Sequence, residues 1–94
     1  MSARLSGLTI GALTLDPTFD PDVGSYTANT KNATNTITAT LEDEEAEVTI
    51  LNGETPVESG TAATWVEGPN TVTITVKNGT AQKVYTIVVT KSTE

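Results

Sequence analysis

The stretch Leu15-Asp-Pro-Thr-Phe-Asp-Pro-Asp-Val-Gly-Ser-Tyr26 decides the fold of this chain. It sets two prolines, three aspartates and two aromatic residues between two runs in which apolar residues alternate with polar ones. Alternation of this kind is the period of a β-strand, and an aspartate beside a proline typically makes a turn with its own backbone. We therefore interpret Asp16, Asp20 and Asp22 as turn-makers rather than metal ligands, with Phe19 and Tyr26 anchoring a crossing between two strands.

Alternation with period two predicts strands along the rest of the chain as well. Threonine occurs 20 times, and together with valine and isoleucine it gives the β-branched composition that pleated sheets favour. The predicted strands are a broken first strand over 5–10 and 13–15, then 26–30, 36–41, 47–51, 61–66, 72–76 and 85–89.

The connections between these strands have their own signals. Asn52-Gly53 and Asn78-Gly79 are predicted to be tight hairpin turns, and Gly68-Pro69 is predicted to begin the sixth strand. Short strands separated by such turns are typical of a sandwich. The predicted fold is all-β, an immunoglobulin-like β-sandwich of about seven antiparallel strands that forms one domain over residues 1–94.

Composition and charge exclude several functions. The chain has no cysteine and no histidine, so it lacks disulfides, thiolate metal sites and the usual general base, and we expect neither an enzyme nor a cofactor. Twelve acidic residues against five basic ones give a net charge of −7, which repels nucleic acid and anionic lipid. No apolar run reaches the roughly 20 residues that span a bilayer, and the chain as given shows no export signal.

A run of five carboxylates in six residues is the candidate metal site. Calcium takes six to eight oxygen ligands, and specific sites normally alternate carboxylates with carbonyl or glycine positions. The run lacks both a glycine and an Asp-x-Asp spacing, so a solvated acidic loop is the favoured interpretation and no metal is expected. Its weak candidate ligands are Glu42, Asp43, Glu44, Glu45 and Glu47.

Trp65 is the residue that best suits ligand binding. An aromatic ring on the face of a sandwich can stack on a sugar, so Trp65 is a candidate glycan contact. The competing interpretation places this lone tryptophan in the core. The sequence offers no second aromatic platform near it.

The order of motifs resembles the bacterial cadherin-like β-sandwich domain over nearly the whole chain. The resemblance rests on Leu5 and Leu8, the opening stretch, Val48-Thr-Ile-Leu-Asn-Gly53, Gly68-Pro-Asn70 with the strand after it, and Tyr85-Thr-Ile-Val-Val-Thr90. One departure is Pro69, which stands where a polar residue is more usual. The resemblance implies a non-enzymatic accessory module of the kind found on bacterial surface and secreted proteins and on structural proteins of tailed phages.

Three functions are expected, two from this resemblance and the third from Trp65. The first is a decoration or tail-associated domain of a phage virion, because a chain without an export signal reaches an exterior when it is assembled with a particle. The second is a spacer or adhesion domain of a bacterial cell-surface or secreted protein. The third is a carbohydrate-binding module that uses Trp65. The expected partners are protein subunits of a virion or cell surface and surface glycans.

Overall fold

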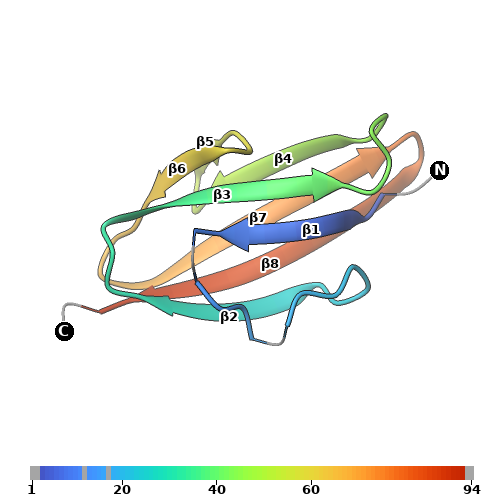
Figure 1. The fold of residues 1–94 in the computed structure, drawn as a ribbon. Helices are drawn as coiled ribbons and strands as arrows, with labels where there is room; N and C mark the ends of the chain where they lie inside the picture. The colour runs from blue at the N-terminus through green and yellow to red at the C-terminus, as the bar shows by residue number, and fades with distance from the viewer. Residues whose placement is uncertain (1–2, 12, 17, 93–94) are drawn as a thin grey trace.

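The computed structural model describes residues 3–11, 13–16 and 18–92, and it shows two β-sheets packed face to face (Figure 1). One sheet has the strand order β1-β3-β6 and the other has the order β2-β8-β7-β4-β5. The strands are β1 (Leu5–Ile10), β2 (Ser25–Thr30), β3 (Thr34–Leu41), β4 (Glu47–Asn52), β5 (Thr55–Val57), β6 (Thr61–Thr64), β7 (Gly68–Asn78) and β8 (Ala81–Lys91). The predicted all-β, immunoglobulin-like sandwich is confirmed.

The strand pairing departs in one place from the predicted antiparallel arrangement. β2 pairs with β8 in parallel, from Ser25 opposite Thr86 to Thr30 opposite Lys91, whereas the other described strand pairs are antiparallel. β1 lies in the three-stranded sheet and β2 in the five-stranded one. The stretch between β1 and β2 carries the chain from one sheet to the other, and β2 then runs in the same direction as β8 (Figure 1).

The structure differs from the predicted strands at two places. The segment Leu13–Leu15 is not a strand, because Gly11 adopts a φ of 57° and turns the chain out of the sheet at the end of β1. Leu15 is nonetheless buried, and Asp16 after it forms an isolated antiparallel bridge with Thr27.

The strand that the sequence did not predict is β5, whose three residues include Pro56. A proline argues against a central strand, but it is tolerated at the sheet edge where β5 lies. Pro17, which the turn prediction includes, lies outside the described residues.

The two predicted Asn-Gly hairpins form, with the turn placed one residue later than the dipeptide. Asn52 pairs with Thr55, and Asn78 pairs with Ala81, so each asparagine is the last residue of its strand. The glycines that follow have φ values of 64° and 63°, while the described residues other than glycine all avoid positive φ. A positive φ at the first loop position alone is the pattern of a type II′ turn, which suits the twist of a hairpin.

The core lies between the inward faces of the two sheets. Buried side chains alternate along each strand as predicted: Tyr26, Ala28 and Thr30 in β2, Val72, Ile74 and Val76 in β7, and Tyr85, Ile87 and Val89 in β8. Ile37 and Ile50 also point inward, as predicted. Such burial stabilises the fold by about 1.5–3 kcal/mol for each large apolar side chain.

Polar groups inside the sandwich are paired. Asn70 is buried at the start of β7, and its side chain accepts the N–H of Val66 and donates to the carbonyls of Val66, Gly68 and Val89 at 2.9–3.1 Å. One amide side chain thus fixes the connection between β6 and β7 to β8. Throughout residues 3–11, 13–16 and 18–92, no buried side-chain nitrogen or oxygen atom lacks a hydrogen-bond partner.

Candidate functional site

Of the three aspartates in the opening stretch, Asp20 makes the local hydrogen bonds of a turn. The Asp20 carboxylate accepts the N–H of Asp22 at 2.9 Å, and the Asp20 carbonyl accepts the N–H of Val23 at 2.9 Å. Asp16 exchanges two backbone hydrogen bonds of 2.8 Å with Thr27. The interpretation of Asp20 as a turn-maker is confirmed, and Asp16 joins the crossing to β2 through its backbone.

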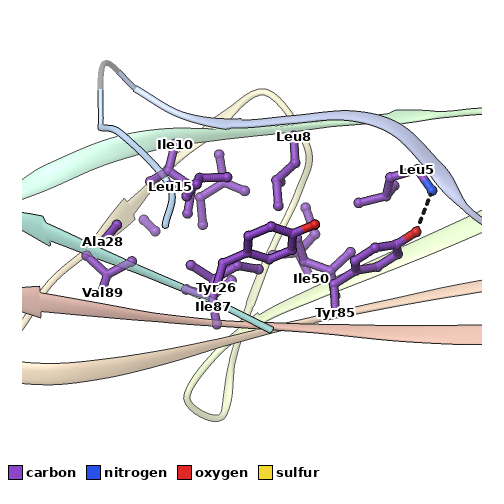
Figure 2. Close-up of a cluster of buried hydrophobic side chains, with 14 of the residues drawn as sticks. Leu5, Leu8, Ile10, Leu15, Tyr26, Ala28, Ile50, Tyr85, Ile87 and Val89 are labelled. Atoms are coloured by element: carbon purple, nitrogen blue, oxygen red, sulfur yellow. Dashed lines mark hydrogen bonds between the residues drawn. The ribbon is translucent and has the colours of Figure 1, made fainter. Parts of the chain in front are cut away.

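Two tyrosine hydroxyls fix the crossing to the core. The Tyr26 hydroxyl accepts the N–H of Asp20 at 2.9 Å and donates to its carbonyl at 2.5 Å. The Tyr85 hydroxyl donates to the carbonyl of Pro21 at 2.7 Å and accepts the N–H of Leu5 at 3.0 Å, the contact drawn dashed in Figure 2. Tyr85 therefore ties β8 both to the crossing and to the first residue of β1.

The rings of the same tyrosines hold Phe19. The Phe19 ring lies 5.7 Å from that of Tyr26 and 6.2 Å from that of Tyr85, measured between centroids. Aromatic pairs at these separations add about 0.5–1.5 kcal/mol beyond the burial of their area. Burial raises the pKa of the Tyr85 phenol, while the hydrogen bond from Leu5 acts in the opposite direction. The predicted anchoring role of Phe19 and Tyr26 is confirmed, and Tyr85 is the third member of the group.

Arg4 joins the crossing to the acidic run. Its guanidinium lies 2.6 Å from the Asp22 carboxylate and 3.1 Å from that of Glu42. Hydrogen bonds to Asp22 and then to Glu42 raise the pKa of Arg4 above its ordinary value. Because the guanidinium and the Asp22 carboxylate are largely exposed to solvent, the ion pairs contribute little to stability.

The rest of the acidic run is divided between structural contacts and solvent. The Asp43 carboxylate accepts the N–H of Glu45 at 3.0 Å and the side-chain N–H of Asn78 at 2.9 Å. Glu44, Glu45 and Glu47 are exposed. In the part of the chain that the structure describes, no three carboxylates come together as ligands for a metal ion. The run therefore has the geometry of a loop between β3 and β4.

The candidate glycan contact is corrected by the structure. Trp65 is only 4% exposed, and its indole N–H donates to the side-chain oxygen of Asn35 at 2.8 Å. The ring thus has no free face on which a sugar can stack. Asn35 occupies an inward position of β3, where alternation calls for an apolar residue. A polar residue at such a position needs a hydrogen-bond partner, so Asn35 was the signal in the sequence that could have predicted this contact.

Two shallow hollows lie along the edge where β5 and β6 meet. One has a volume of about 340 Å³ between Thr55–Glu58 and Thr61–Thr64. The second, of about 390 Å³, shares Asn52, Thr55 and Thr64 with the first and extends past Val66, which is 66% exposed. Their linings carry one carboxylate, that of Glu58, so they hold no pair of titratable groups for acid–base chemistry. Sequence reasoning missed these hollows because they depend on the position of β5.

No helix in the described ranges has the length and apolar character to cross a membrane. A comparison with curated proteins gives no match. The model of the cadherin-like beta sandwich domain matches residues 5–92, which run from the first residue of β1 to the residue after β8. Because that match covers nearly the whole chain and the structure is the expected two-sheet sandwich, the chain belongs to the cadherin-like β-sandwich domain family.

Proposed function

We propose that this domain is a non-enzymatic structural spacer on an extracellular surface. Cadherin-like β-sandwich domains are structural or adhesion-type modules and are generally non-catalytic. The observation that carries the proposal is the position of the first and last strands. The domain is elongated, with extents of 44 × 24 × 17 Å, and β1 begins at one end of the long axis while β8 finishes at the other (Figure 1).

This geometry lets copies or neighbouring domains join in series. A domain whose chain enters and leaves at opposite ends adds its full length to the distance between the domains it connects. The outer faces of both sheets also favour a solvated spacer, because threonine dominates their exposed positions: Thr34, Thr36, Thr38 and Thr40 in β3, and Thr49, Thr71, Thr27 and Thr90 in the other sheet.

We propose that the spacer lies on the surface of a phage virion; the alternative setting is a bacterial cell surface. Both settings use the same property, which is extension of the chain away from an attachment point. Neighbouring reading frames separate them: capsid and tail genes beside this one support the virion, and genes of surface or secreted proteins support the cell.

The spacer geometry is tested by small-angle X-ray scattering of two copies joined head to tail by a short linker. We expect a maximum dimension near twice the 44 Å length of one domain. The matched control is one copy with the same linker at its C-terminus. A dimension of the two-copy protein close to that of one copy would mean that the domains fold back on each other, and it would overturn the proposal.

A further inference from the structure

We propose that the parallel ladder between β2 and β8 is a mechanical clamp that resists force applied through the two ends of the domain. The inference rests on the proposed spacer function, because a module joined in series is pulled through its ends. It adds a property that a spacer does not require, since a domain can hold two neighbours apart and still unfold under a small force.

The direction of the two strands relative to the pull determines how the ladder is loaded. β2 and β8 run in parallel through six paired positions, so the start of β2 faces the end of the domain where β1 begins, and the end of β8 faces the other. A pull on the two ends therefore slides β2 and β8 past each other along their length. The hydrogen bonds of a parallel ladder are evenly spaced, so this shear stretches them together and not in succession.

Neighbouring contacts keep both strands of the ladder in place. β8 is held on its other side by eleven paired positions with β7. The ladder with β2 is extended at both ends by backbone hydrogen bonds, from Thr86 N–H to Gly24 at 2.8 Å and from Ser92 N–H to Thr30 at 3.0 Å. The Thr30 hydroxyl also accepts the N–H of Asn32 at 3.0 Å, which fixes the C-terminal end of β2.

β1, which precedes β2 in the chain, is held by a weaker ladder. It pairs with β3 through five positions, and a bulge between Leu5 and Gly7 interrupts the register. Its hydrogen bond from Leu5 to Tyr85 and the exposed ion pairs of Arg4 supplement that ladder. We expect β1 to yield first under load and the uninterrupted β2–β8 ladder to bear the larger force. The chain has no cysteine, so no disulfide shares the load.

The test pulls the same ladder in two directions by single-molecule force spectroscopy. Since the chain has no native cysteine, engineered pairs define the attachment points. The exposed pair Ser25→Cys and Ser92→Cys shears β2 against β8, whereas the exposed pair Lys31→Cys and Ser92→Cys separates the strands from one end. At equal loading rate we expect the mean unfolding force in shear to be about twofold or more above that of unzipping, because the shear stretches all six pairs together.

Chemical denaturation of both double variants serves as the control, and it is expected to give equal stabilities. Unfolding forces that are equal in the two directions, or larger on unzipping, would overturn the clamp. That outcome leaves the spacer untouched, because the scattering experiment measures only how joined domains are arranged. A folded-back two-copy protein combined with a high shear force would instead remove the spacer and keep the mechanical property.

Discussion

At the scale of the residue, Tyr85 has a structural role that the sequence did not predict. Its ring is fully buried beside Phe19, and its hydroxyl donates to the crossing at Pro21. The same hydroxyl accepts the N–H of Leu5 in β1, the contact drawn in Figure 2. The loss of that hydroxyl leaves the N–H of Leu5 and the carbonyl of Pro21 without this partner. An unsatisfied buried group of this kind costs about 1–3 kcal/mol.

The Tyr85→Phe variant is therefore expected to be less stable than the parent by about 1–3 kcal/mol at neutral pH. The difference should narrow in alkali. The pKa of Tyr85 is raised by burial, so the folded chain keeps the phenol proton after the unfolded chain has lost it. The stabilising effect is complete below about pH 10 and is lost as the pH rises through the folded-state pKa.

Urea unfolding of both proteins between pH 7 and pH 11.5 measures this effect. The parent should lose stability above about pH 10 more steeply than the variant, which has no phenol to ionise at this position. The other ionisable groups are the same in both proteins, so the comparison isolates the phenol of Tyr85. A stability gap that stays constant across the range would contradict the assignment.

At the scale of the element, the β4–β5 hairpin depends on one glycine. Gly53 has a φ of 64°, and a methyl group added there would meet no atom within 4 Å. Any cost of Gly53→Ala is therefore a backbone cost, expected at about 1–2 kcal/mol in denaturant unfolding. Gly53→Asn should cost less, because asparagine tolerates positive φ.

Gly7→Ala is the matched control for the hairpin variant. The φ of Gly7 lies outside the left-handed region, and its added methyl group would meet Thr40 at an ordinary 3.8 Å. We expect its stability to stay close to that of the parent. Equal losses in Gly53→Ala and Gly7→Ala would show that the hairpin has no special requirement for a glycine.

At the scale of the whole molecule, we expect calcium to leave the stability of the domain unchanged, because the carboxylates of the acidic run point to different partners. Glu42 pairs with Arg4, Asp43 bonds the backbone of Glu45 and the side chain of Asn78, and the remaining carboxylates of the run face solvent. We expect the melting temperature to be the same in excess chelator and in millimolar Ca²⁺. A ligand that binds only the folded form must raise that temperature.

Magnesium at matched ionic strength is the control for this measurement, since the net charge of −7 makes the protein sensitive to screening alone. A rise with calcium that magnesium does not reproduce would reveal a native-state site. Thermal melts in the three buffers are sufficient to decide between these outcomes.

Much of the fold could be predicted from the sequence. The alternation of Val72, Ile74 and Val76, and of Tyr85, Ile87 and Val89, fixed both the strands and their inward faces. Alternation succeeds because successive side chains on a strand point to opposite sides of the sheet, so burial leaves a period of two in the chain. The role of Asp20 followed in the same way, since an Asx turn involves only its own neighbours.

Partners distant in the sequence were decided only by the tertiary structure. The parallel pairing of Tyr26 with Ile87, the burial of Trp65 against Asn35 and the dispersal of the acidic run all depend on which strands become neighbours. A residue pattern states which face is apolar, but it does not name the strand that will lie alongside. By itself the sequence therefore determined a cadherin-like sandwich, and the direction in which β2 meets β8 was settled only when the crossing carried the chain between the sheets.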